Sequence, residues 1–225
     1  MKKTRMWMII VIISVILVLL AIRFIFLYNT NNKSNGEIKN ELIKQEIEEF
    51  VNVEYSGIFC SMYPISNYEA TDFETYVGVK TYQSSVEAVD LEEVAQYLEV
   101  ALQKETQVSH IFLGLEPSEI MASSKGKADK WNENINQYLS SYIEENPDVA
   151  FRIMLPNFSK DYWMDMKSEE VKEKLQAYER LVMDLSVYEN VICYFLGNEE
   201  WLISNPSNFA TKYEPHKELT RKMLL

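Results

Sequence analysis

The stretch "EYSGIFCSMYPISNYE", residues 54–69, indicates the fold of this chain. Residues 56–60 have the apolar, β-compatible content of a buried strand, and the run stops at Ser61, which Met62, Tyr63 and Pro64 follow. In a parallel α/β sheet, ligands bind at the carboxyl ends of the strands, so a polar residue there is a candidate for chemistry. Ser61 is then either a nucleophile or a serine that closes a strand and caps the next turn.

The rest of the chain repeats this pattern of short apolar runs and amphipathic segments. We expect strands at residues 56–60, 77–82, 108–115, 149–155 and 190–197. Amphipathic helices are expected after Asp90, where Glu93 stands in capping-box position, from about Asp129, and after Ser168. Strands that alternate with helices predict a three-layer α/β/α fold with a mostly parallel five-stranded sheet.

The apolar residues of these strands should form the core. We expect burial of Ile58, Phe59, Ile111, Leu113, Ile153, Leu155, Ile192 and Phe195. Cys60 and Cys193 fall in the same strands, where free cysteines behave as small hydrophobes, although a disulfide between them is an alternative outside the cell. Two cysteines and two histidines provide no zinc-binding spacing, so we expect no metal and no cofactor.

The N-terminus predicts a membrane anchor. Residues 6–27 form an apolar run that only Ser14 and Arg23 interrupt, and a helix of this length is about 33 Å long, enough to cross a bilayer. Basic residues precede the run, so the positive-inside rule keeps the N-terminus in the cytoplasm. A cleaved signal peptide is the alternative, but no small-x-small cleavage site follows. We expect a cytoplasmic tail at residues 1–5 and a single-pass signal anchor in the cell membrane at residues 6–28.

The part beyond the anchor is acidic and long enough for one domain. A polar tether and an amphipathic helix are expected at residues 29–53, before a domain at residues 54–225. All 34 acidic residues and 18 of the 22 basic ones follow residue 28, which gives this extracytoplasmic part a net charge of −16. Such a surface repels nucleic acid and anionic headgroups, so we expect neither as a partner.

Polar residues follow several expected strands and are candidates for binding. Glu116 lies in "GLEP" after the third strand, and Asn157 and Asp161 lie in "PNFSKDYW" after the fourth. Asn198 and Glu199 follow the fifth strand. The carboxyl ends of parallel strands meet at one edge of the sheet, so these residues should lie on the same edge as Ser61.

The two histidines are expected at opposite edges of the sheet. His110 begins its strand, at the amino edge of the sheet, whereas His216 follows the last strand and can return over the carboxyl edge. If Ser61 has a general base, His216 is therefore the histidine that can serve.

A strand that ends in Ser61 near the start of such a domain, with His216 near its end, resembles the SGNH/GDSL-type hydrolases. The segments "IFCSMYPISNYEATDFETYVGVKTY", "LPNFSKDYW" and "EEWLISNPSNF" are similar to those of membrane-anchored SGNH-like proteins of Gram-positive bacteria. The resemblance implies an esterase or acyl transferase with Ser61 as nucleophile and His216 as base. Tyr213 stands where the family has aspartate, and Glu214 is the substitute for orienting the imidazole.

The resemblance is partial at the groups that stabilise an oxyanion. Glu116 stands near the position of the family's asparagine, and the second-block glycine has no clear counterpart, although Ser84 and Ser85 lie nearby. Two hypotheses follow: a membrane-anchored extracytoplasmic esterase or acyl transferase that acts on cell-envelope esters or glycans, and a catalytically inactive SGNH-like domain that binds envelope glycan or partner proteins. The chain ends nine residues after His216, so a truncated C-terminus is a further expectation.

Overall fold

The computed structural model describes residues 45–46, 55–63, 69–84, 88, 90–103, 108–125, 127–195, 203–211 and 214–223. The chain divides into two compact units, Met1–Gln45 and Glu46–Leu225, and the elements below belong to the second. Among the described residues, no helix combines the length and the apolar character that a membrane span needs. The anchor expected at residues 6–28 and most of the helix expected before residue 53 lie outside the described ranges.

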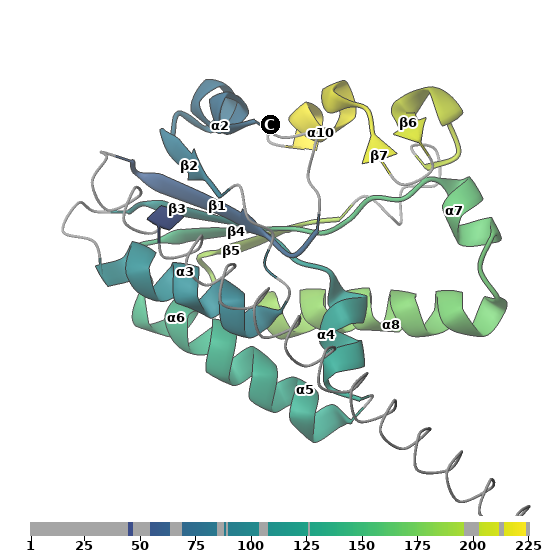
Figure 1. The fold of residues 1–225 in the computed structure, drawn as a ribbon, viewed down its shortest axis with the longest axis horizontal. Helices are drawn as coiled ribbons and strands as arrows, with labels where there is room; N and C mark the ends of the chain where they lie inside the picture. The colour runs from purple at the N-terminus through teal and green to yellow at the C-terminus, as the bar shows by residue number, and fades with distance from the viewer. Residues whose placement is uncertain are drawn as a thin grey trace, which may run out of the picture. The chain divides into compact units, whose positions relative to one another are not determined.

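The second unit is an alternation of strands and helices (Figure 1). In chain order its elements are β1 (Gly57–Ser61), α2 (Ala70–Val77), β2 (Thr81–Gln83), α3 (Leu91–Gln103), β3 (His110–Gly114), α4 (Pro117–Ser123), α5 (Ala128–Ile135), η1 (Asn136–Ser140), α6 (Ser141–Glu145), β4 (Ala150–Met154), α7 (Lys160–Met164), α8 (Ser168–Leu185), β5 (Val191–Tyr194), η2 (Pro206–Asn208), β6 (Phe209–Thr211), β7 (Glu214–Pro215) and α10 (Lys217–Met223).

The expected three-layer arrangement is confirmed. Five parallel strands form one sheet in the order β2-β1-β3-β4-β5. Figure 1 shows α3, α4, α5, α6 and α8 on one face of the sheet, and α2, α10, β6 and β7 on the other. The strand order reverses between β1 and β3, which is the point where open parallel sheets bind ligands.

The core residues of the central strands lie where the sequence predicts. Ile58, Phe59, Ile111, Leu113, Ile153 and Leu155 are all at most 2% exposed. Successive side chains of a strand point to opposite faces. Phe59, Phe112 and Met154 accordingly pack with Phe73 of α2 and with Val79, whereas Ile111 and Leu113 point to the opposite face.

The burial predicted for Ile192 is wrong. Ile192 is 48% exposed, because β5 is the edge strand of the sheet and pairs only with β4 in the described part of the chain. Phe195 follows β5 and is half-buried, with its ring 5.0 Å from that of Tyr178. Apolar content alone does not distinguish an edge strand from a central one.

The strand expected at residues 77–82 is also placed differently. Helix α2 occupies residues up to Val77 and begins with a capping box, in which the side chains of Glu69 and Asp72 each accept a backbone N–H of the other's position. Gly78 then ends the helix with φ of +76°, a conformation that only glycine adopts without cost. Strand β2 therefore begins at Thr81.

The segment after Asp129 is helical but interrupted. The α-helix α5 passes into the π-helical turn η1 and then into α6. Trp131, Ile135 and Leu139 are buried, as the apolar stripe predicts. A π-turn adds a residue to the helix and changes which residues face the sheet beyond it. The hydrophobic spacing does not reveal this turn.

A disulfide between Cys60 and Cys193 is excluded by the sheet. Both cysteines are free, and they occupy the same row of the sheet in register with Leu113 and Ile153, which lie between them on β3 and β4. Neighbouring strands lie about 4.8 Å apart, so three strand spacings separate the two cysteines by roughly 14 Å. A disulfide needs Cα atoms within about 7 Å.

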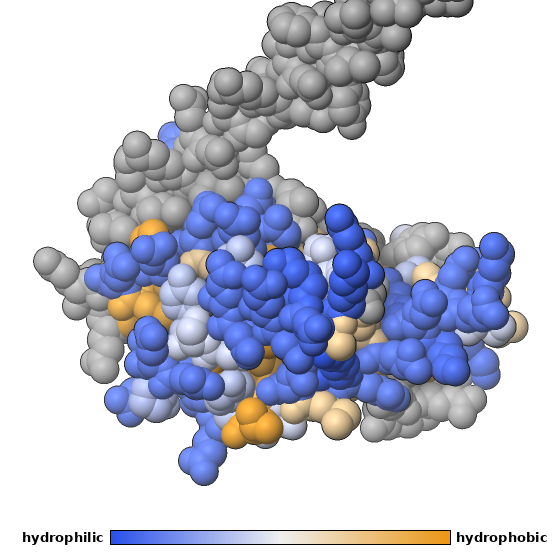
Figure 2. Space-filling model, turned by 90° about the horizontal axis from the view of Figure 1, so that it is seen from below, coloured by the Kyte–Doolittle hydropathy of each residue, from blue (hydrophilic) through white to orange (hydrophobic). Residues whose placement is uncertain are grey.

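The helical face of the unit is mostly hydrophilic (Figure 2). Large apolar side chains are exposed singly and do not form one patch. Met183 of α8 is 71% exposed, and Val187, which follows α8, is 72% exposed. Isolated apolar residues of this kind are normal on a soluble surface.

Candidate active site

Ser61 is the last residue of β1, one position later than the strand predicted from the sequence. It pairs in register with Gly114 at the end of β3, which in turn pairs with Met154 at the end of β4. These three residues therefore form a row at the carboxyl edge of the sheet, at the point where the strand order reverses. Ser61 is 8% exposed.

The Ser61 hydroxyl is engaged by the turn that follows it. Ser61 Oγ donates to the carbonyl of Tyr63 at 2.6 Å and accepts the Tyr63 backbone N–H at 3.1 Å. The carbonyl of Gly114 lies 3.4 Å away. The Tyr63 hydroxyl donates to the Met154 carbonyl at 3.2 Å, which fixes the turn over the sheet edge. Ser61 thus closes the strand as a serine turn does.

His216 lies between β7 and α10 with an exposed side chain. Its backbone N–H donates to the Asn208 carbonyl at 2.7 Å, and its carbonyl accepts the Leu219 N–H at 2.9 Å. Within the described residues, no hydrogen bond joins the imidazole to Ser61 Oγ. Glu214 is a residue of β7. The structure therefore fixes the backbone around His216 and does not pair its ring with Ser61.

The backbone N–H groups beside Ser61 already donate hydrogen bonds within the fold. The Met62 N–H donates to the Gly114 carbonyl at 2.8 Å, and the Tyr63 N–H donates to Ser61 Oγ. The Ala88 N–H donates to the Ser61 carbonyl at 2.8 Å. An oxyanion hole needs donors aimed at the developing charge. The Met62 and Tyr63 donors become available only if the turn after β1 moves.

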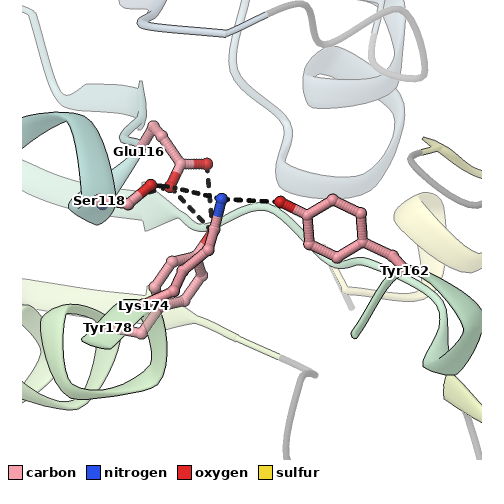
Figure 3. A network of polar contacts seen from close by, with 5 residues as sticks. All are labelled: Glu116, Ser118, Tyr162, Lys174 and Tyr178. Carbon is pink, nitrogen blue, oxygen red and sulfur yellow. Dashed lines mark hydrogen bonds and ion pairs between the residues drawn. The ribbon is translucent and has the colours of Figure 1, made fainter. Parts of the chain in front are cut away.

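Glu116 is the centre of a polar network (Figure 3). It caps the start of α4, accepting the Ser118 backbone N–H at 3.2 Å and the Ser118 hydroxyl. The Tyr178 hydroxyl lies 3.2 and 3.3 Å from its two oxygens, and Lys174 Nζ lies 3.4 Å from Oε1. Lys174 also donates to the Tyr162 hydroxyl at 2.9 Å. Glu116 is 7% exposed, so this carboxylate is a satisfied buried group.

Tyr178 and Lys174 complete the surroundings of Glu116 from helix α8. Burial, and then the negative charge of Glu116, raise the pKa of Tyr178 well above 10. Tyr178 is therefore a neutral hydrogen-bond donor at physiological pH. Lys174 Nζ lies 4.8 Å from the centre of the Phe158 ring, a cation–π distance. The donors of Ser118, Lys174 and Tyr178 are all engaged with Glu116.

Of the remaining binding candidates, the structure describes Asn157 and Asp161, which differ in burial. Asn157 is buried and its side-chain amide donates to the Leu155 carbonyl at 3.1 Å. Asp161 is exposed in the first turn of α7, a helix that Ser159 caps. Asn198 and Glu199 lie outside the described residues. Of the expected edge residues, Ser61, Glu116 and Asn157 all follow or end central strands, as predicted.

Sequence reasoning missed the partners of Glu116. Lys174 and Tyr178 are four residues apart on α8, so they occupy one face of the helix. Tyr162 comes from α7, a short helix that the sequence pattern did not predict. The available signal was a lysine within an otherwise apolar stripe, since a buried lysine requires an acidic partner. His110 begins β3 at the amino edge, as expected, away from Ser61.

A groove of about 620 Å³ lies between α4 and α8. Ser118 and Lys174 line it together with Met121, Lys125 and Met166. Within the described ranges, no three side chains of the metal-binding types come together as a metal site would require.

Comparisons with known proteins identify the fold. No family model matches the chain, and no curated protein matches it significantly. One similar solved structure is described as "a putative platelet activating factor from Streptococcus pneumonia". It has a TM-score of 0.53 and 15% sequence identity, and the match covers 91% of this chain and 95% of that one. At this identity the likeness shows a shared fold, so function has to be argued from the site.

Proposed function

We propose that this chain is a membrane-anchored serine esterase or acyl transferase of SGNH type, acting outside the cell on esters of the cell envelope. The observation that carries the proposal is the position of Ser61, the last residue of β1 at the carboxyl edge, where the strand order reverses. The fold shared with the streptococcal structure is compatible with this activity. The anchor at residues 6–28 belongs to the proposal, on the basis of the apolar sequence.

In the proposed reaction, Ser61 Oγ leaves the Tyr63 carbonyl and forms a bond to the ester carbonyl carbon, while a ring nitrogen of His216 accepts the hydroxyl proton. Collapse of the tetrahedral intermediate breaks the bond to the leaving alcohol, which takes that proton. Water or an acceptor alcohol then attacks the acyl-serine with His216 again as base, releasing the acid or the new ester and restoring Ser61. Glu214 orients the imidazole in this scheme.

Turnover should be slow. The loss of one oxyanion donor costs ~10²–10³ in rate, and the N–H groups of Met62 and Tyr63 are engaged elsewhere. The turn after β1 has to shift when substrate binds, because Ser61 has to exchange its bonds with Tyr63 for one with the base.

A second candidate is a catalytically inactive domain that binds envelope glycan or a partner protein at the same edge. The observation that favours it is the state of Ser61, whose hydroxyl both donates to and accepts from Tyr63. The buried carboxylate of Glu116, at the position where the resemblance would have asparagine, also favours it.

Labelling of the full-length protein in detergent with a fluorophosphonate, and hydrolysis of a small acetyl ester, test the proposal. Ser61→Ala and His216→Ala should each abolish hydrolysis, and the double variant should lose no more, because nucleophile and base act as one unit. Ser123→Ala on α4 and His110→Gln at the opposite edge are matched controls that should retain activity. Absence of labelling, or equal turnover in Ser61→Ala and the parent, would favour the binding domain.

A further inference from the structure

Two ion pairs join the C-terminal helix α10 to the start of α2, and Figure 1 shows the two helices on the same face of the sheet. Lys217 Nζ pairs with the Glu69 carboxylate. Arg221 Nε donates to Asp72 Oδ1 at 2.8 Å. The partners are 148 and 149 residues apart in the sequence, so these contacts connect the two ends of the described domain.

The acidic partners are the capping-box residues of α2. Asp72 Oδ2 accepts the Glu69 backbone N–H at 3.0 Å, which leaves Oδ1 for Arg221. The Asp72 side chain is only 5% exposed, and a buried carboxylate needs such a partner. Lys217 and Arg221 are four residues apart on one face of α10, and the capping box joins Glu69 to Asp72 at the start of α2. The two contacts therefore form together.

The clasp, defined as these four residues, connects the two segments that carry the proposed catalytic groups. Helix α2 is the first helix after Ser61 among the described residues, and His216 directly precedes Lys217. The His216 backbone is bonded at both sides, to Asn208 and to Leu219, and Leu219 is 8% exposed. A shift of α10 against α2 would therefore displace His216 relative to β1.

We propose that Lys217 and Arg221 are positioning residues that fix His216 relative to α2 and β1, by holding α10 against the capping box of α2. This inference rests on the proposed function. The Arg221–Asp72 contact is the stronger of the two, because Asp72 is buried, whereas Lys217 and Glu69 are 44% and 53% exposed and screened by salt.

Hydrogen exchange of the α10 amides in the full-length protein measures how firmly the clasp holds α10, and this readout does not depend on enzymatic activity. Lys217→Gln should lower protection by about two- to five-fold, the value of an exposed ion pair. Arg221→Gln should lower it about tenfold or more, because a charge-assisted bond to a buried carboxylate is lost. Arg221→Lys should retain part of the protection. Lys172→Gln removes the same charge from an exposed position of α8 and should leave α10 unchanged.

A double-mutant cycle tests whether Arg221 acts through Asp72. Asp72→Asn keeps an oxygen for the capping box and removes the charge, so Arg221→Gln should add little exchange in the Asp72→Asn background. Simple additivity of the two effects, or parent-like exchange in Arg221→Gln, would overturn the clasp.

Kinetics test the positioning role. Arg221→Gln should lower kcat for the acetyl ester about tenfold with little change in KM, because the base is displaced while the substrate site remains, and Arg221→Lys should restore much of the rate. Altered exchange with unchanged kcat would overturn positioning and leave a structural clasp. A parent without ester turnover would overturn the proposed function and with it the positioning role, and the exchange cycle would still decide the clasp independently.

Discussion

At the carboxyl edge, the side chains of Ser61 and Glu116 are held by hydrogen bonds and an ion pair with neighbouring residues. Ser61 is tied to Tyr63, and Glu116 is surrounded by Ser118, Lys174 and Tyr178. A hydroxyl or carboxylate held in this way has to exchange one hydrogen bond for another before it engages a ligand, and the net difference is only about 1 kcal/mol for neutral groups. The reactivity of Ser61 thus depends on the conformation of the turn after β1. The hydrogen bonding of Glu116 depends on Lys174 and Tyr178 of helix α8.

Lys125 provides a test at the residue scale. Its φ of +52° lies in the left-handed region, which costs a residue with a Cβ about 1–2 kcal/mol. Lys125→Gly should raise the free energy of unfolding by about 0.5–1 kcal/mol, since the relief exceeds the added entropy of the unfolded chain. Lys127→Gly, at φ of −89°, should give no gain. Urea denaturation measures both, and equal effects at the two positions would contradict the assignment of strain to Lys125.

Cys60 links stability to pH. Burial, and then the charges of Glu46 and Glu93, raise the pKa of its thiol from 9.0 to about 12. The unfolded chain therefore releases this proton first as the pH rises, so the contribution of Cys60 to stability is complete below pH 9 and is lost between pH 9 and about 12. The free energy of unfolding should fall less steeply over this interval in Cys60→Ala than in the parent. Identical slopes would show that the thiol ionises equally in both states.

At the scale of elements, the position of a strand within the sheet decides how much its apolar residues contribute to the free energy of unfolding. Strand β3 pairs with β1 on one side and β4 on the other, and its apolar residues are fully buried. Strand β5 has one partner in the described sheet. Its residue Ile192 is half exposed, although the sequence of β5 is as apolar as that of β3. Gly57 shows the same dependence on neighbours, since a Cβ there would lie 2.7 Å from Val79 Cγ1.

Substitution of isoleucines in the two strands measures this difference. Ile111→Ala on β3 should lower the free energy of unfolding by about 2–5 kcal/mol, through lost transfer energy and the cavity left behind. Ile192→Ala on β5 is the matched control and should cost less than about 1.5 kcal/mol, because half of its side chain already contacts solvent. Thermal or urea denaturation gives both values, and equal losses would mean that the two strands are equally buried.

At the scale of the whole molecule, the proposal combines a domain at the carboxyl end of the chain with an anchor at its beginning. The shared fold with the streptococcal structure supports the domain, and the apolar residues 6–27 support the anchor. A surface with net charge −16 after residue 28 would repel anionic headgroups, so the domain should contact the membrane through its anchor rather than its surface.

Protease accessibility tests this topology. Protease added to intact spheroplasts should digest the domain while a fragment containing residues 6–27 stays with the membrane. A variant with the three basic residues before the span replaced by glutamine should show mixed orientation, because the charge bias that retains the N-terminus in the cytoplasm is lost. Protection of the domain until lysis, or its release into the medium by cleavage near residue 30, would contradict the anchor.

The sequence by itself determined the layers of the domain. Apolar runs with β-compatible residues predicted β1, β3, β4 and β5 and only the first part of β2, and the apolar stripe after Asp90 predicted α3, because these patterns are local and each element has to bury one face. The bond from the Glu93 N–H to Asp90 Oδ1, at 3.0 Å, confirms the expected cap. Ser61 and Glu116 could be assigned to the carboxyl edge for the same reason, since a residue that ends a parallel strand can lie only there.

Tertiary structure decided what local patterns do not encode. The strand order made β5 an edge and separated Cys60 from Cys193, and both follow from pairings between distant segments. The salt bridge of Glu116 with Lys174 and that of Asp72 with Arg221 join residues 58 and 149 positions apart, respectively. A carboxylate that looks like a solvated loop residue in sequence becomes a buried partner only when another helix brings a cation to it, because burial and charge pairing are properties of the packed chain.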